Sequence, residues 1–274
     1  MSAPIGVFDS GLGGLTVVRR VRELLPRERI VYVADQAHVP YGGRRLDEVR
    51  DFACAISEAL LSAGCRTVVM ACNISSAVAL PVEQAWHPEL PLLGMIQPGA
   101  EAAVIRTHNG RVGILATQGT VTSGAYTRAL LALDAHLLVT EVACPAFVPL
   151  VEAGQEDSPE AEAAARIYLA PLLAADVDTV VLGCTHYPFL LPLLHRLRPN
   201  MLFLDPAEET VARLSRTLIC REVASASAIS APHQLFTTGD LPAFRAQLRR
   251  FLPEVTDGIT IAKATWDQGD LRLD

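Results

Sequence analysis

The chain has 274 residues, of which half are apolar and 19% are charged, and its formal net charge is −7. This composition is typical of a globular protein, and a chain of this length can bury a core without disulfides or a structural metal. The acidic balance disfavours a general nucleic-acid-binding protein, no apolar run is long enough for a membrane span, and the first residues do not resemble a signal peptide.

Short apolar, β-branched runs alternate with segments of helical periodicity. The predicted strands are 5–8, 30–34, 67–71, 91–95, 112–116, 137–142, 179–182 and 201–204. Apolar residues recur every three or four positions from Leu46 to Leu60, and we expect Gly64 to end this helix. Residues 161–175 and 207–219 have the same period. Continuous apolar strands joined by helices predict a parallel sheet covered on both faces. Near the end, strands at 234–238 and 259–262 are predicted to flank a helix at 241–252.

The chain also contains an internal repeat. Residues 6–13 and 113–120 each read as a strand that enters a glycine-containing turn before a helix. Residues 68–73 and 180–185 each read as a strand that ends in a cysteine and a polar residue. The two elements recur in the same order at nearly equal spacing. We therefore predict two similar α/β lobes related by a pseudo-twofold axis, with the site between them: residues 1–96 plus 207–274, and residues 97–206.

Polar residues follow several of the predicted strands. The segments concerned are Asp9-Ser10, Cys72-Asn73 and Cys184-Thr185-His186. Ligands of open parallel sheets bind at the carboxyl ends of the strands, and a helix N-terminus after each strand would favour an anion such as a carboxylate. If the lobes face each other, Cys72 and Cys184 converge on one small ligand from opposite sides.

Two of the six cysteines are therefore candidates for chemistry, and we expect all six to be reduced in a cytoplasmic protein. A free thiol has a pKa of about 8.5 and is mostly protonated at pH 7. A helix N-terminus would lower the pKa of Cys72 and Cys184, and a protonated His186 would lower that of Cys184 further. Asp9 would raise the pKa of Cys72, but it could position or accept the thiol proton.

Other motifs are weak. Gly11-x-Gly13 lacks the third glycine of a dinucleotide fingerprint, and there is neither a P-loop nor a Gly-x-Ser-x-Gly elbow. Cys184-x-His186 would need distant partners to bind a metal, so no metal is expected. A Cys-His hydrolase stays open as an alternative, although it leaves the second cysteine without a role.

Five sequence blocks carry a family resemblance. They are 8–14 (FDSGLGG), 40–42 (PYG), 71–73 (ACN), 144–152 (CPAFVPLVE) and 183–188 (GCTHYP). In these blocks, and over nearly its whole length, the chain resembles the glutamate racemases, which need no cofactor and make D-glutamate for peptidoglycan. His186 favours this branch over the related aspartate racemases.

The resemblance implies a two-base mechanism. Cys72 would deprotonate D-glutamate with help from Asp9, and Cys184 would deprotonate L-glutamate with help from His186. Glu152 matches an acidic family position near the site. The residues that would bind the substrate, besides Asp9 and His186, are Ser10, Tyr41, Gly42, Asn73, Ile74, Thr120 and Thr185. The only expected partner is the small-molecule substrate, and a homodimer is a possible assembly because dimers are common in the family.

One departure from the family pattern concerns Ile74, which stands where a threonine is usual. Losing a hydrogen bond to a charged group costs about 1.5–3 kcal/mol. This substitution leaves two alternatives open. The chain could be a low-activity or non-catalytic relative that binds an acidic amino acid, or a racemase for another acidic amino acid.

Overall fold

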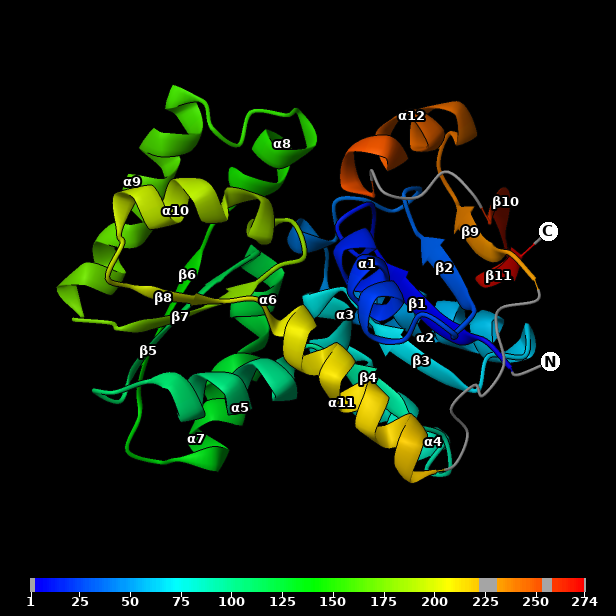
Figure 1. Cartoon of the computed structure of the whole chain (residues 1–274), viewed down its shortest axis with the longest axis horizontal. Helices are drawn as coiled ribbons and strands as arrows, with labels where there is room; N and C mark the ends of the chain where they lie inside the picture. Colours follow the sequence, from blue (N-terminus) through cyan, green and yellow to red (C-terminus); the bar gives the residue numbers. More distant parts are fainter. Residues whose placement is uncertain (1–2, 222–230, 253–257, 274) are drawn as a thin grey trace.

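The protein is built on two β-sheets that lie side by side (Figure 1). The computed structural model describes residues 3–221, 231–252 and 258–273. Met1 and Ser2, the first residues of the segment tested for a signal peptide, lie outside this range. Strands from both the beginning and the end of the chain belong to the larger sheet, so the chain leaves that sheet once and returns to it.

The larger sheet has seven strands in the order β11-β10-β9-β2-β1-β3-β4. Its strands are β1 (Ile5–Asp9), β2 (Ile30–Ala34), β3 (Thr67–Met70), β4 (Leu92–Gly94), β9 (His233–Thr237), β10 (Ile259–Asp267) and β11 (Asp270–Leu273). The accompanying helices are α1 (Leu15–Leu24), the 3₁₀ turn η1 (Tyr41–Gly43), α2 (Leu46–Ser62), α3 (Asn73–Val78), α4 (Leu80–Trp86), α11 (Pro206–Cys220) and α12 (Leu241–Phe251). Every pairing is parallel except β10 with β11.

The smaller sheet has four parallel strands in the order β6-β5-β7-β8. Its strands are β5 (Arg111–Ala116), β6 (Leu138–Ala143), β7 (Thr179–Gly183) and β8 (Leu202–Leu204). Its helices are α5 (Ile96–Arg106), α6 (Gln118–Ser123), α7 (Ala125–Leu133), α8 (Phe147–Glu152), α9 (Pro159–Ala174), the 3₁₀ turn η2 (Tyr187–Leu190) and α10 (Leu191–Leu197). The order β6-β5-β7-β8 repeats the order β2-β1-β3-β4 of the larger sheet, which is the structural form of the internal repeat.

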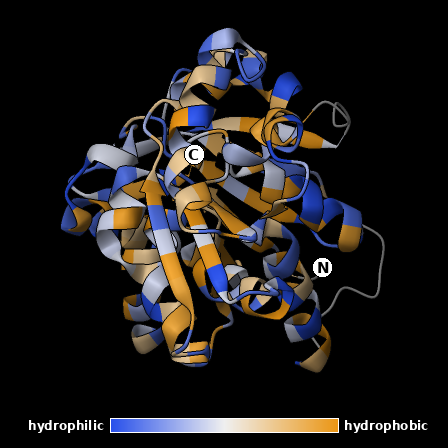
Figure 2. Ribbon diagram, turned by 90° about the vertical axis from the view of Figure 1, so that its left-hand side faces the viewer, coloured by the Kyte–Doolittle hydropathy of each residue, from blue (hydrophilic) through white to orange (hydrophobic). Residues whose placement is uncertain are grey.

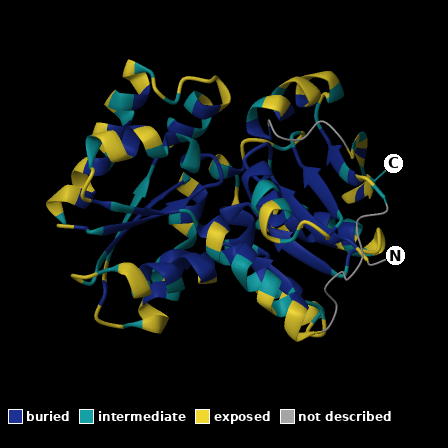
Figure 3. Cartoon of the chain, in the orientation of Figure 1, coloured by how far each residue is buried: buried dark blue, intermediate teal, exposed yellow. Residues whose placement is uncertain are grey.

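The strands form the core of each lobe. Residues of β1, β2, β3 and β7 are all buried, and most of them are apolar. Figure 2 shows strands coloured largely as hydrophobic. The outer faces of the helices carry the exposed residues (Figure 3). A parallel sheet covered on both faces buries successive side chains on either side. The predicted fold class, two α/β lobes with mostly parallel sheets flanked by helices, is confirmed. The exact lobe boundaries stay a prediction.

Gly64 has φ +84° and follows the last turn of α2, as expected of the residue that ends a helix. The predicted strand at 259–262 is longer than expected and turns back into β11, through Gln268 (φ +51°) and Gly269 (φ +97°). In the part of the chain that the structure describes, no helix is both long and apolar enough to cross a bilayer.

Candidate active site

A pocket of about 470 Å³ lies at the carboxyl ends of the central strands of both sheets, a size typical of small-molecule sites. The first lobe contributes Asp9, Ser10, Tyr41, Gly42, Cys72, Asn73 and Ile74 to its lining. The second lobe contributes Thr120, Glu152, Cys184, Thr185 and His186. The structure therefore brings together every residue that the sequence predicted for the site.

Strand pairing explains why these residues meet. Phe8 of β1 pairs with Met70 of β3, so Asp9 and Cys72 leave one sheet at the same edge. In the second lobe, Ala116 of β5 pairs with Gly183 of β7, which places Cys184 at the matching edge. Thr117 and Gln118 also line the pocket, and we did not predict them. The repeat of residues 6–13 and 113–120 already indicated them, because Thr117 and Gln118 occupy the positions of Ser10 and Gly11 in it.

Cys72 precedes α3 directly, and its side chain is buried. Its sulfur lies 4.0 Å from the hydroxyl oxygen of Ser10. Burial, and secondly the charge of Asp9, raise the pKa of this thiol to about 11, although hydrogen bonds from Ser75 and Ser10 oppose the shift. The expected effect of Asp9 is thus confirmed. The backbone N–H of Ser75, in the first turn of α3, lowers the pKa as expected of a helix N-terminus, but desolvation outweighs it and the net shift is upward.

Cys184 lies beside a pair formed by His186 and Glu152. The sulfur is 3.9 Å from Nδ1 of His186, and Nε2 of His186 is 3.2 Å from Oε1 of Glu152. Burial raises the pKa of Cys184 well above its usual value. As predicted, the segment Cys184-Thr185-His186 precedes a helical element, which is the 3₁₀ turn η2 that begins at Tyr187. Neither cysteine is therefore a thiolate at neutral pH by virtue of its surroundings alone.

Asp9 is buried at the contact between the lobes. Its Oδ2 accepts the backbone N–H of Gly11 at 3.1 Å, and its Oδ1 accepts the hydroxyl of Thr185 at 3.4 Å. Burial raises the pKa of Asp9, while the charge of His186 and the hydrogen bonds lower it. A Cβ at Gly13 would lie 2.2 Å from Oγ1 of Thr185, so only glycine permits this approach of the second lobe.

Asn73 presents a free donor to the pocket. Its Oδ1 accepts the hydroxyl of Tyr126 at 2.7 Å, which fixes the orientation of the amide. Its Nδ2 is buried and has no hydrogen-bond partner among the described residues. Since a buried N–H without an acceptor is costly, this group is suited to an oxygen atom of a ligand.

Ile74 is buried at the pocket wall and packs against the second lobe. A Cβ at Gly119 of α6 would lie 2.2 Å from Cδ1 of Ile74. The absence of a side chain at Gly119 therefore makes the room that the branched side chain of Ile74 needs. The isoleucine is an apolar contact between lobes as well as part of the pocket.

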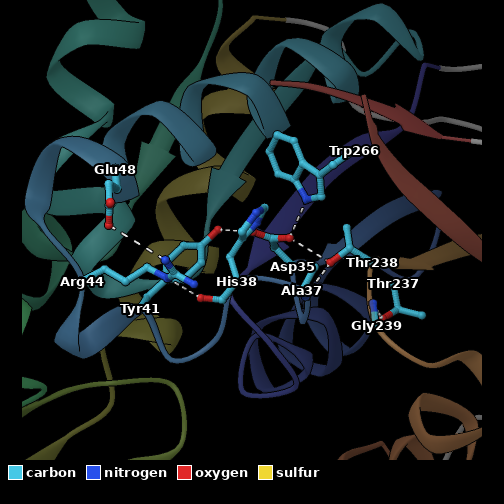
Figure 4. Close-up of polar contacts among 10 residues, drawn as sticks. All are labelled: Asp35, Ala37, His38, Tyr41, Arg44, Glu48, Thr237, Thr238, Gly239 and Trp266. Atoms are coloured by element: carbon cyan, nitrogen blue, oxygen red, sulfur yellow. Dashed lines mark hydrogen bonds and ion pairs between the residues drawn. The ribbon is translucent and has the colours of Figure 1, made fainter. Parts of the chain in front are cut away.

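Tyr41 is held in place by a buried carboxylate (Figure 4). Its hydroxyl donates to Oδ2 of Asp35 at 2.6 Å, and Nδ1 of His38 lies 2.8 Å from the same oxygen. The other oxygen accepts the hydroxyl of Thr238 and the indole N–H of Trp266, each at 2.8 Å. Asp35 therefore connects the pocket segment after β2 to Thr238, which follows β9, and to Trp266 of β10.

The pocket lining combines apolar and polar residues, and among the described residues around it there is neither lysine nor arginine. A bound carboxylate would have to be held by backbone N–H groups, hydroxyls and the amide of Asn73. The one group of His, Cys, Asp and Glu side chains spaced for a metal ion within the described ranges is Glu58, Glu83 and His87, and these residues do not line the pocket.

A sequence profile of the Asp/Glu/hydantoin racemases matches residues 5–214. The chain belongs to this family. Among its racemase relatives, the glutamate racemase of Desulforudis audaxviator is 43% identical over 264 residues, which cover 93% of this chain and 96% of that protein. The crystal structure of a glutamate racemase isoform from Bacillus anthracis superposes with a TM-score of 0.89 at 35% identity and covers 98% of both chains. That of Francisella tularensis glutamate racemase in complex with D-glutamate gives a TM-score of 0.88 at 27% identity, covering 95% of this chain and 97% of that one.

Proposed function

We propose that this protein is a cofactor-independent glutamate racemase that interconverts L- and D-glutamate with two cysteines. The observation that carries the proposal is the placement of Cys72 and Cys184 at equivalent strand ends of two different sheets, both lining one pocket. Inversion at a carbon atom needs a base on one face and an acid on the other. Two opposed thiols supply such a pair, because a thiol and a thiolate differ by one proton.

In the direction from L- to D-glutamate, Cys184 removes the α-proton and Cys72 delivers its own proton to the opposite face. Cys184 must first lose its proton, since burial keeps it protonated. Nδ1 of His186 is the acceptor at 3.9 Å. If Nε2 carries a proton and donates it to Glu152, Nδ1 has a free lone pair toward the sulfur, and the carboxylate stabilises the imidazolium that forms.

In the reverse direction Cys72 is the base. Asp9 is its partner, because burial raises the pKa of Asp9 and so favours its protonated form. The negative charge that develops on the substrate needs preorganised donors. Nδ2 of Asn73 is such a donor, and Ser10, Tyr41, Gly42, Thr120 and Thr185 supply further hydroxyl or backbone groups around the pocket.

The substrate proposal rests on the family and on relatives of about 40% identity named as glutamate racemases. D-Glutamate made by such an enzyme would serve peptidoglycan synthesis in the cytoplasm. We also propose that the two lobes, residues 1–96 plus 207–274 and residues 97–206, act as the two halves of the site.

The direct test is the rotation of polarised light by L-glutamate, and separately by D-glutamate, incubated with purified protein without added cofactor. We expect the rotation to decay to zero from either enantiomer, and aspartate to react far more slowly. Binding of D-glutamate by calorimetry without loss of rotation would contradict the proposal and indicate a non-catalytic relative. Faster decay with aspartate would contradict the substrate assignment alone.

A further inference from the structure

Four polar side chains face one another between α2 and α4, outside the pocket. Cys54 and Glu58 come from α2, and Glu83 and His87 come from α4 and the residue that follows it. Each pair is spaced by four residues, which places its members one turn apart on the same helix face. One ligand atom from each of Glu58, Glu83 and His87 lies within 4.8 Å of the others.

Glu83 is the unusual member of this group. Its exposed fraction is 0%. Among the described residues, no nitrogen or hydroxyl group donates a hydrogen bond to either of its carboxylate oxygens. Burying a carboxylate without donors is costly, and buried charged groups in proteins are normally paired or bound to a metal. The carboxylate therefore points to a positively charged ligand.

We propose that Glu58, Glu83 and His87 bind a divalent transition-metal ion of the zinc class, which joins α2 to α4. The ligand types fit this ion, which takes carboxylate oxygen and imidazole nitrogen at about 2.0–2.2 Å in a tetrahedral arrangement. Such bonds place ligand atoms about 3.3 Å apart, so the present separations need only side-chain adjustment. Nε2 of His87 and Oε1 of Glu58, at 2.5 Å, would move apart around the ion.

The identity of the ion follows from the donors. Calcium and magnesium prefer sites built from oxygen alone, whereas imidazole selects zinc and its neighbours. The thiol of Cys54 interacts with the carboxylate of Glu83 and is the neighbouring group that would complete a four-coordinate site. The side chain of Glu58 is 49% exposed, which gives the ion a route from solvent.

The expected effect is on stability. None of the three ligands lines the racemase pocket, and a metal that binds only the folded chain stabilises it according to its free concentration. At a hundredfold excess over Kd, we expect the melting temperature to rise by about 5–10 °C. This inference is independent of the proposed racemase activity.

The experiment must separate this site from other thiols that bind zinc. Calorimetric titration with ZnCl₂ and thermal melting would therefore use the full chain with Cys72→Ser, Cys184→Ser and Cys220→Ser as the background. We expect one zinc ion per chain and no stabilisation by MgCl₂ at the same concentration. Glu83→Gln and His87→Gln should each weaken zinc binding at least tenfold. Glu89→Gln, a change at a neighbouring exposed glutamate, should leave it unchanged.

Two results would overturn the proposal. One is a background protein that binds no zinc or gains no stability from it. The other is an affinity that both variants leave intact. If Glu83→Gln does not fold, His87→Gln decides alone, because this half-buried residue lies at the end of α4 and is less important for packing.

Discussion

The hydroxyl of Thr185 donates a hydrogen bond of 3.4 Å to Oδ1 of Asp9, although 176 residues separate them. This contact joins the loop after β7 to the end of β1, and thus one lobe to the other at the wall of the pocket. It also lowers the pKa of Asp9 against the larger effect of burial.

Thr185→Val should remove this hydrogen bond and reduce kcat/KM for glutamate about five- to tenfold, since one net hydrogen bond is worth about 1–1.5 kcal/mol. Steady-state kinetics with L-glutamate measure the loss. Thr185→Ser, which keeps the hydroxyl, should restore most of the activity. Equal rates for the valine variant and the unmodified protein would show that the contact has no role in catalysis.

The two carboxylate oxygens of Asp35 have different partners, so we expect variants at one oxygen to change KM and variants at the other to change stability. Tyr41→Phe and Asp35→Asn should each raise KM for glutamate about fivefold. Each weakens the hydrogen bond between Tyr41 and Asp35 that positions the segment after β2 in the pocket wall. The double variant should be little worse than either single one, since both remove the same hydrogen bond. Trp266→Phe is the matched control: it removes a donor from the other oxygen of the carboxylate. It should cost about 1 kcal/mol of unfolding free energy and leave KM unchanged, so a rise in its KM would refute this division.

Ile74→Thr tests the departure from the family pattern. A hydroxyl at the pocket wall should lower KM for glutamate about tenfold, which corresponds to about 1.4 kcal/mol. The same change should lower the free energy of unfolding by about 1–2 kcal/mol, because it removes apolar contact against Gly119. Ile74→Val keeps the site apolar and should leave KM unaltered. An unchanged KM for the threonine variant would mean that this position does not contact the substrate.

The buried side chain of His233 predicts that the folded protein loses stability in acid. Nδ1 of His233 accepts the backbone N–H of Ile30 at 3.2 Å, and burial lowers the pKa of His233 to about 4. Above pH 6.5 the histidine is mostly neutral in both folded and unfolded states, so it does not make the stability depend on pH. Below pH 6.5 the unfolded chain binds a proton that the folded chain excludes, so stability falls until about pH 4. At pH 5 the loss should be about 2 kcal/mol relative to pH 7.

Urea unfolding at pH 7 and pH 5 measures this loss. His233→Gln cannot titrate, so its stability should fall by about 2 kcal/mol less between the two pH values. An identical pH dependence in the two proteins would assign the acid sensitivity to other groups.

Much of the site was predictable because local sequence patterns determine where its residues lie. Apolar strands with polar residues at their carboxyl ends placed Asp9, Cys72 and Cys184 correctly, and the repeat paired the two cysteines. The Asp35 network was not predictable, since its donors Thr238 and Trp266 lie more than 200 residues away in sequence. The pairing of β9 with β2, and of β10 with β9, brings these segments together.

The sequence did not predict the direction of the net pKa shift at the two cysteines. Local sequence shows the groups that lower a thiol pKa, such as the start of a helix or a nearby histidine. It does not show how deeply the thiol is buried, which depends on the closure of two lobes. At Cys72 and Cys184 desolvation is the largest effect and has the opposite sign.

The central claim is that two different cysteines remove and return the α-proton. NMR of L-glutamate, and separately of D-glutamate, in D₂O tests it most directly. With two bases, the first deuterium should appear in the product enantiomer and not in the remaining substrate, from either direction. Cys72→Ala and Cys184→Ala should each abolish racemisation while the chain stays folded. Early deuterium in the unreacted substrate, or full turnover by either alanine variant, would contradict the two-cysteine mechanism.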